Sequence, residues 1–256
     1  MLRRASTLVA LVGLAVFALP AGASATPVVT FKAKAVAIPG FRGTGNILGA
    51  GAALQVQYTI RGTEYGGFPP PLIGVNFFTP AGTKLHPQGF VSCSPTALKD
   101  TGPAACPAKS KVTIAGEALG VVSFGNERVE EKASIQAFFA PGGALQFYTQ
   151  GTSPVSLEFL SPSRVVSAKR PYGQEFMTTV PLIETVPGAP DASTQSINVK
   201  VGAAFRKGKK VTYYGTVPTK CPKGGFPLKS QLLFAGLGGL PPQMVTATYK
   251  APCPRR

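Results

Sequence analysis

The sequence contains no tryptophan, one histidine and two aspartates. The missing tryptophan argues against a glycan-binding cleft, because such clefts commonly stack sugar rings on exposed indoles. A Ser-His-acid triad would have to use His86, and the following Pro87 indicates an extended or edge position for that histidine. No Gly-x-Ser-x-Gly nucleophile elbow occurs. These absences disfavour a hydrolase that depends on histidine.

Metal and nucleotide sites find equally little support. The four cysteines include no Cys-x-x-Cys pair, and with one histidine a zinc site lacks ligands. Asp and Asn residues do not cluster as they do in a calcium loop. The glycine-rich residues 43–51 lack the Gly-Lys-Ser/Thr end of a phosphate loop, and a strand rather than a helix is predicted after them. We therefore expect no cofactor and no metal.

Glutamates leave one catalytic alternative open, because a pair of carboxylates can hydrolyse a glycosidic bond. The glutamates considered for such a pair, six of the eight in the sequence, are Glu117, Glu130, Glu131, Glu158, Glu175 and Glu184. Glu130 and Glu131 are adjacent on a predicted strand, so their side chains point to opposite faces and do not pair. Glu117 or Glu158 could lie in a cleft, although each would also balance a nearby cation on a solvated face. A secreted hydrolase of cell-wall or extracellular polysaccharide is thus the alternative function.

The N-terminal residues have the pattern of a secretory signal. Arg3 and Arg4 precede an apolar run over residues 8–19, which is too short to span a bilayer. Residues 23–25, Ala-Ser-Ala, form a small-residue cleavage site typical of a bacterium. We predict a signal peptide over residues 1–25 and a mature chain that starts at Thr26. The expected location is secreted, extracellular or associated with the cell envelope, with no membrane span.

The cysteines Cys93, Cys106, Cys221 and Cys253 are even in number. In an exported chain this predicts disulfides, and four cysteines allow three pairings. Local pairing of Cys93 with Cys106 and of Cys221 with Cys253 is favoured, because the intervening segments are typical of compact loops or hairpins. Each closure would stabilise the fold by roughly 3 to 4 kcal/mol on the loop-entropy argument.

Basic residues outnumber acidic ones, with 26 Lys and Arg against 10 Asp and Glu. Without Arg3 and Arg4 of the signal the balance is 24 against 10, a formal net charge of about +14. Such a chain is attracted to polyanions, and an anionic cell-envelope polymer is a possible partner. The basic residues are scattered, which is also typical of a protein that uses lysine for solubility. We expect no specific nucleic-acid partner, and the oligomeric state stays open.

Alternation of apolar and polar residues with a period of two dominates the mature chain. Residues 54–60 show it clearly and predict a half-buried strand. Similar runs occupy residues 29–37, 72–78, 111–124, 133–139, 145–148, 155–160, 197–205, 211–217, 228–234 and 245–249. Turn residues separate these runs, and a helical turn is expected only at residues 94–98, where Ser94 can cap and Pro95 takes the first position.

Ten or more short strands with almost no helix predict an all-β fold. We expect a large antiparallel β-sandwich, jelly-roll-like or immunoglobulin-like, reinforced by the disulfides. One sandwich over residues 26–256 is favoured because no linker shows a composition shift. The alternative is two small sandwiches joined near residues 161–190, where the strands are least clear.

The densest positive charge comes from Arg206, Lys207, Lys209 and Lys210. These residues lie between two predicted strands, so they form a hairpin tip. A basic tip beside Tyr213 and Tyr214 can bind a polyanion. It is also what an ordinary solvated turn looks like, with Gly208 supplying a positive φ.

Two blocks of the sequence resemble recurrent segments of uncharacterised exported actinobacterial proteins. The first combines residues 89–94 (GFVSCS) with residues 102–107 (GPAACP), and the second combines residues 221–227 (CPKGGFP) with residues 251–254 (APCP). The resemblance covers about a third of the mature chain and implies disulfide pairing within each block. It departs from the pattern after Ser110, where a Gly-x-Gly is usual. It implies no activity.

The sequence thus favours an exported, non-enzymatic protein that binds an anionic cell-envelope polymer or another surface protein.

Overall fold

The computed structural model of the chain describes residues 26–124, 127–186, 189–190, 192–236 and 238–254. The predicted signal peptide, residues 1–25, lies outside the described residues. Among the helices of the described residues, none is long and apolar enough to cross a membrane.

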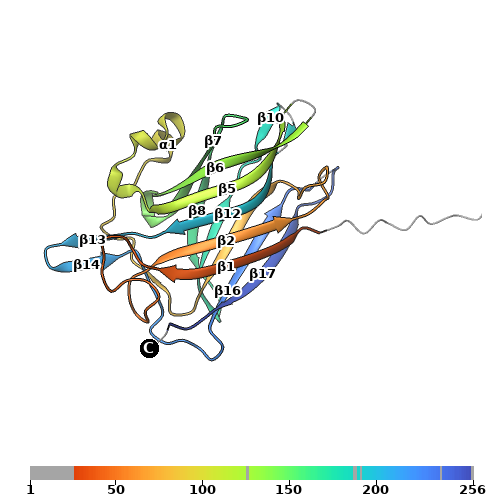
Figure 1. The fold of residues 1–256 in the computed structure, drawn as a ribbon. Helices are drawn as coiled ribbons and strands as arrows, with labels where there is room; N and C mark the ends of the chain where they lie inside the picture. Colours follow the sequence, from red (N-terminus) through yellow and green to blue (C-terminus); the bar gives the residue numbers. More distant parts are fainter. Residues whose placement is uncertain (1–25, 125–126, 187–188, 191, 237, 255–256) are drawn as a thin grey trace, which may run out of the picture.

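Eleven antiparallel strands form one sheet (Figure 1). They are β1 (Val28–Val36), β2 (Ala53–Arg61), β3 (Leu72–Pro80), β5 (Thr113–Phe124), β6 (Glu127–Phe139), β7 (Leu145–Gly151), β8 (Leu157–Ser167), β9 (Tyr172–Thr179), β12 (Ser193–Val201), β16 (Phe226–Phe234) and β17 (Gln243–Ala251). Their order across the sheet is β1-β2-β12-β5-β6-β7-β8-β9-β3-β16-β17. The two outermost strands, β1 and β17, contact each other, so the sheet curls round on itself.

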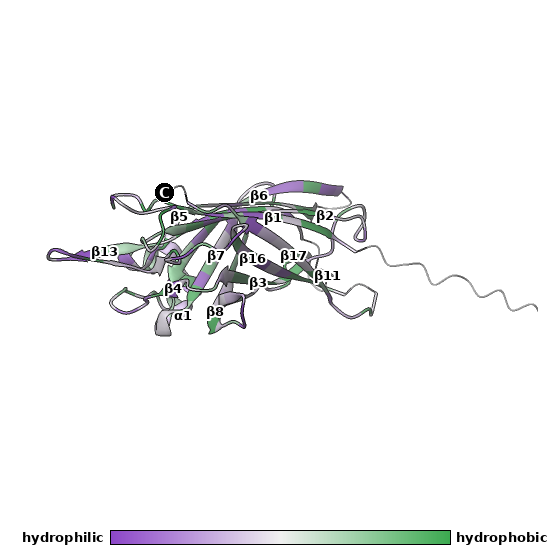
Figure 2. Cartoon of the chain, turned by 90° about the horizontal axis from the view of Figure 1, so that it is seen from below, coloured by the Kyte–Doolittle hydropathy of each residue, from purple (hydrophilic) through white to green (hydrophobic). Residues whose placement is uncertain are grey.

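The curled sheet has two layers. Figure 2 shows β1, β2, β5 and β6 along one layer and β3, β8 and β16 in the other. The layers continue into each other through the pairing of β6 with β7. The predicted all-β, antiparallel sandwich with little helix is confirmed, and its two layers are the halves of a single continuous sheet.

Alternation along each strand decides which side chains face the interior. In β2, Val56 and Tyr58 are buried while Gln57 and Thr59 are exposed. The register places Tyr58 opposite Phe31 of β1 and opposite Ile197 of β12, so these side chains share the inner face. This inner face carries the main hydrophobic core.

The core joins the two layers directly. The ring of Phe31 lies 5.7 Å from that of Tyr58 and 6.3 Å from that of Phe77, which belongs to β3 in the opposite layer. The Tyr58 hydroxyl lies 2.8 Å from Ser230 Oγ of β16, and this hydrogen bond also connects the layers. Aromatic packing and one buried hydrogen bond therefore hold the strands at this end of the interior.

A second, smaller core lies on the outer face of the sheet. The segment between Cys93 and Cys106 contains α1 (Pro95–Thr101) and η1 (Pro103–Ala105), and η2 (Ala108–Ser110) follows it. Leu98 of α1 is fully buried and belongs to one apolar cluster with Phe138 of β6 and Tyr148 of β7. Gln146 Nε2 donates to the Cys93 carbonyl at 2.8 Å and fixes the segment to β7. The helical turn expected at residues 94–98 is present, although Ser94 makes no side-chain capping bond.

Both disulfides that local pairing predicts are present. Cys93 is bonded to Cys106, with Cα atoms 5.1 Å apart, and Cys221 to Cys253, with Cα atoms 5.8 Å apart. The second bond ties the segment that leads into β16 to the end of β17. The two bonds fit an oxidising compartment.

Several short strands complete the structure. They pair as β4 (Lys84–Leu85) with β15 (Gly215–Thr216), β10 (Glu184–Val186) with β11 (Ala189–Pro190), and β13 (Ala204–Lys207) with β14 (Lys210–Tyr213); η3 (Pro141–Gly143) precedes β7. The run predicted as one strand over residues 197–205 is divided between β12 and β13, and that over residues 211–217 between β14 and β15.

The stretch at residues 161–190 holds more regular structure than its sequence indicates. β8 runs to Ser167, and β9 pairs with β8 on one side and with β3 on the other. Strands from before and after this stretch thus belong to the same sheet. The organisation of residues 26–256 as a single sandwich domain stays a prediction.

Candidate functional site

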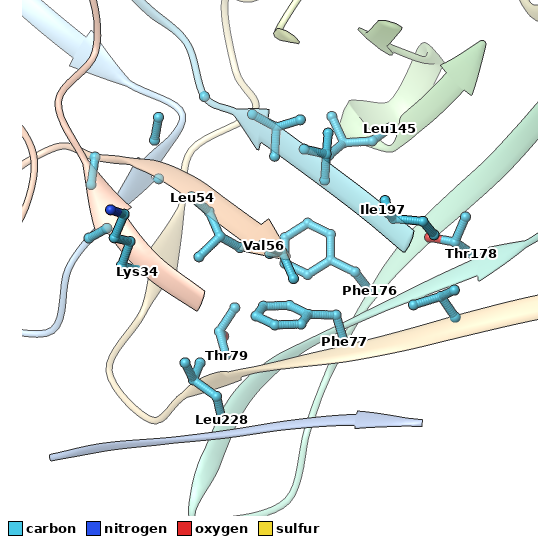
Figure 3. A pocket seen from close by; sticks show the side chains of 18 of the residues that line it. Lys34, Leu54, Val56, Phe77, Thr79, Leu145, Phe176, Thr178, Ile197 and Leu228 are labelled. Atoms are coloured by element: carbon cyan, nitrogen blue, oxygen red, sulfur yellow. The ribbon is translucent and has the colours of Figure 1, made fainter. Parts of the chain in front are cut away.

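A cavity of about 290 Å³ lies between the two layers of the curled sheet (Figure 3). It is lined by inward side chains from both layers, most of them apolar. Those labelled in Figure 3 are Lys34, Leu54, Val56, Phe77, Thr79, Leu145, Phe176, Thr178, Ile197 and Leu228.

Strand register brings the lining side chains together. Phe77 of β3 lies opposite Phe176 of β9, and Val75 lies opposite Thr178, so all four point to the inner face. In Figure 3 the rings of Phe77 and Phe176 point into the same space as Leu54 and Val56 from the other layer. The cavity is therefore formed by the sheet itself and not by surface loops alone.

Small side chains explain why the space is not filled. Ala35 of β1, Ala53 of β2 and Ala118 of β5 line one side of the cavity. Facing layers of a sandwich lie about 10 Å apart, and large side chains are needed to fill that gap. An alanine at such a position leaves part of the gap empty.

Several hydroxyl groups of the lining have partners within the protein. Thr178 Oγ1 donates to Ser163 Oγ at 3.0 Å. Thr79 Oγ1 accepts from the Gln174 backbone N–H at 3.1 Å. Buried hydroxyls normally are hydrogen-bonded, and these follow that rule.

Two fully buried hydroxyls of the lining lack such partners. Ser161 of β8 and Tyr214, which lies between β14 and β15, both line the cavity. Their side chains are deeply buried, with residue exposures of 2% and 6%. Among the residues that the structure describes, Ser161 Oγ and the Tyr214 hydroxyl have no hydrogen-bond partner.

Burial keeps the interior phenols neutral. It raises the pKa of Tyr214 well above its ordinary value, and it does the same for the pKa of Tyr58 against a smaller opposing effect of Ser230. Both hydroxyls can therefore donate and accept hydrogen bonds at neutral pH.

Charge is confined to one place in the lining. Within the described part of the chain, Lys34 of β1 is the charged residue that lines the cavity, and its side chain is exposed. Asn46 also lines the cavity. No buried cation among the described lining residues is therefore available to neutralise an anion inside the cavity.

The predicted basic hairpin is formed by β13 and β14, which project from the body of the molecule (Figure 1). Arg206, Lys207, Lys209 and Lys210 are all exposed. Lys207 pairs with Lys210, and Gly208 between them has a φ of 59°, which favours glycine at the first position of a two-residue turn.

Tyr213 is the last residue of β14, and Tyr214 follows it directly. Tyr213 lies edge-on to Phe41, with ring centroids 6.4 Å apart. Tyr214 is buried against Phe139, with ring centroids 4.9 Å apart. The burial of Tyr214 therefore removes one of the two aromatic rings that the sequence places beside the tip.

The glutamates considered for catalysis lie away from the cavity. Glu117 accepts from Asn198 Nδ2 at 3.0 Å and Glu158 accepts from Gln150 Nε2 at 2.7 Å, and both glutamates are exposed. They alternate along their strands with Ala118 and Phe159, which line the cavity, so the two carboxylates face outward.

The side chains of the adjacent Glu130 and Glu131 point to opposite faces of β6, as alternation along a strand requires. Glu130 forms an exposed ion pair with Lys132, with Nζ and Oε1 3.8 Å apart. Glu131 is buried and accepts backbone N–H groups from Ser153 and Val155 at 3.4 and 3.1 Å. Glu131 therefore anchors the loop between β7 and β8.

His86 is exposed, and its backbone N–H donates to the Tyr214 carbonyl at 2.7 Å.

No family model, curated protein or solved structure matches this chain.

Sequence reasoning did not identify the cavity. The alternation shows which side chains face inward, but it does not show how far two layers stand apart. The sequence does contain one sign of a cavity: several inward positions hold alanine, serine or threonine. In a filled core, large apolar residues would occupy these positions.

Proposed function

We propose that this protein is an exported, non-enzymatic binding protein that holds an apolar small molecule inside the curled sheet. The cavity of about 290 Å³ with its largely apolar lining supports this proposal. In another protein an apolar cavity of about 150 Å³ is enough to bind benzene. The space here is about twice as large, so it matches a two-ring molecule or a medium-length hydrocarbon chain.

The positions of the carboxylates favour binding over hydrolysis. A glycosidase needs two carboxyl groups that face one cleft. Glu117 and Glu158 point away from the cavity and hydrogen-bond to amide side chains on the outer face. Export is supported by the signal pattern at residues 1–25 and by the two disulfides.

The basic hairpin supports a second, independent function as a contact for an anionic cell-envelope polymer. Its four cations are exposed on a projecting element, where a polymer has free access. Polyanion binding needs little more than such a charge cluster. This function and the cavity can coexist, because the hairpin tip lies outside the interior.

Filling the cavity tests the main proposal. Naphthalene is a suitable probe because it has two rings and because its fluorescence is read without interference from tryptophan, which the chain lacks. Val56→Phe places a larger side chain in the cavity, and we expect the Kd for naphthalene to rise at least about tenfold.

Thr59→Phe is the matched control, since Thr59 lies on the same strand but is exposed on the outer face. It should leave the Kd unchanged. Equal affinity in all three proteins, or no binding by the natural protein, would contradict an interior binding site.

A further inference from the structure

We infer that the ligand of this cavity is a neutral molecule with an oxygen group, a hydroxyl or a carbonyl, that hydrogen-bonds to Ser161 and Tyr214. The inference rests on the proposed function and adds the chemical class of the ligand.

The two unpartnered hydroxyls are the basis of the inference. A buried hydroxyl without a partner destabilises a protein, and native structures seldom retain one. Ser161 Oγ and the Tyr214 hydroxyl are both buried, both belong to residues that line the cavity, and neither has a partner among the described residues. They come from separate elements, so two independent parts of the chain each present an unused hydroxyl to one cavity.

Other hydroxyls of the lining have partners within the protein. Ser163 lies two residues from Ser161 on the same face of β8, and its Oγ accepts from Thr178 Oγ1 at 3.0 Å. Tyr58, the other deeply buried tyrosine of the lining, is bonded to Ser230 at 2.8 Å. Ser161 and Tyr214 therefore differ from comparable residues close by.

The chemistry of these hydroxyls selects a neutral oxygen group. Serine and tyrosine hydroxyls each donate one hydrogen bond and can accept others, so they match an alcohol or a carbonyl. A carboxylate buried at the same place would need a cation beside it. Lys34 is the charged lining residue of the described chain and it is exposed, so an anionic group is expected only where Lys34 meets solvent.

The experiment compares ligands that differ in one group. Naphthalene and 2-naphthol are titrated by fluorescence at pH 7, and decan-1-ol and decanoate are titrated by displacement of naphthalene. The proteins are the natural chain, Ser161→Ala, Tyr214→Phe and the double variant. Ser110→Ala and Tyr148→Phe are matched controls, because both residues are buried and neither lines the cavity, and Ser110 Oγ donates to the Pro107 carbonyl rather than to a residue of the lining.

We expect 2-naphthol and decan-1-ol to lose about tenfold in affinity for the double variant, as the loss of a hydrogen bond requires. Naphthalene should bind the natural chain and the double variant equally well. The control variants should leave all affinities unchanged, and decanoate should bind more weakly than decan-1-ol to the natural chain.

Two failures are distinguishable. In the first, naphthalene binds, but 2-naphthol and decan-1-ol bind the double variant as tightly as the natural chain. The hydroxyls of Ser161 and Tyr214 then make no hydrogen bond to the ligand, and the inference on ligand chemistry is overturned. In the second, none of naphthalene, 2-naphthol and decan-1-ol binds the natural chain, and the proposed function itself fails.

Discussion

At the scale of single residues, hydrogen bonding distinguishes the buried hydroxyl groups of the interior. Tyr58 and Tyr214 are both buried phenols of the cavity lining, yet one is bonded to Ser230 and the other has no partner among the described residues. Removing the two hydroxyls should therefore have different effects on folding.

Tyr58→Phe should lower the free energy of unfolding by about 0.5 to 1.5 kcal/mol, because the hydrogen bond between the two layers is lost while Ser230 Oγ still donates to the Asn76 carbonyl. Tyr214→Phe removes a hydroxyl that makes no bond in the ligand-free protein, so stability should stay equal or rise. Urea titrations of both variants measure the difference. Equal losses would contradict the assignment of the Tyr214 hydroxyl as unpartnered.

At the scale of elements, the sequence predicts the strands with a regular apolar period and misses β9, whose inner face mixes apolar and polar residues. β2 alternates apolar Val56 and Tyr58 with polar neighbours and is evident from the sequence. β9 places Phe176 and Thr178 on its inner face, and the polar threonine weakens the hydropathy period. The same hydroxyl-bearing residues line the cavity, so the missed strand and the missed site have one cause.

The sequence predicts local pairing better than it predicts which distant segments pack together. The pairing within each disulfide was predictable because the intervening segments are short and compact. The position of the Cys93–Cys106 segment on the outer face of β6, β7 and β8 was not, because it follows from long-range packing against Phe138 and Tyr148. Likewise, the burial of Tyr214 beyond the basic hairpin depends on where the curled sheet leaves room.

Leu98 is the buried side chain of α1, in the segment between Cys93 and Cys106. Leu98 is 0% exposed and packs in the outer cluster with Phe138 and Tyr148. Leu98→Ala should lower the free energy of unfolding by about 2 to 5 kcal/mol, whereas Thr96→Ala, at an exposed position of the same helix, should change it by less than about 0.5 kcal/mol. Thermal unfolding followed by circular dichroism compares the two. A small effect of Leu98→Ala would show that the segment contributes little to the fold.

The basic hairpin should bind polyanions through its local charge. Replacing Arg206, Lys207, Lys209 and Lys210 with neutral residues should weaken binding to heparin and reduce its dependence on salt, since fewer counterions are released. Stability should change little because these side chains are exposed. Binding is measured over a series of salt concentrations.

The control for the hairpin removes four exposed cations elsewhere, Lys32, Lys84, Lys132 and Lys250. If this variant loses as much affinity and as much salt dependence, the net charge of the chain explains the binding. The hairpin would then be an ordinary solvated turn.

At the scale of the whole molecule, burial of phenols links stability to alkaline pH. Burial, together with Glu158, raises the pKa of Tyr148 to about 12, and burial raises the pKa of Tyr58 and Tyr214 further. In the unfolded chain these groups lose their protons near pH 10, while the folded chain retains them. The folded state then binds more protons, so its stability is complete below about pH 10 and falls as the pH rises further.

We therefore expect the free energy of unfolding to fall above about pH 10 by up to about 1.4 kcal/mol per pH unit for each buried tyrosine. The variant in which Tyr58, Tyr148 and Tyr214 are all phenylalanine should show a much flatter profile. Urea unfolding between pH 8 and about pH 11 measures both. Parallel profiles would attribute the loss to the lysines, whose titration is common to the two proteins.

The contact between β1 and β17 has a consequence for the order of events in folding. β1 begins at Val28 and β17 ends at Ala251, so the strands that meet to enclose the interior come from opposite ends of the described chain. Contacts between residues so distant in sequence form slowly, because a long loop must close first. Until the last strand arrives, Phe31 lacks its neighbour Tyr249 of β17, and the interior stays open along one side. The cavity is therefore enclosed only once β17 has joined β1, so under the proposed function a ligand is enclosed only after this contact has formed.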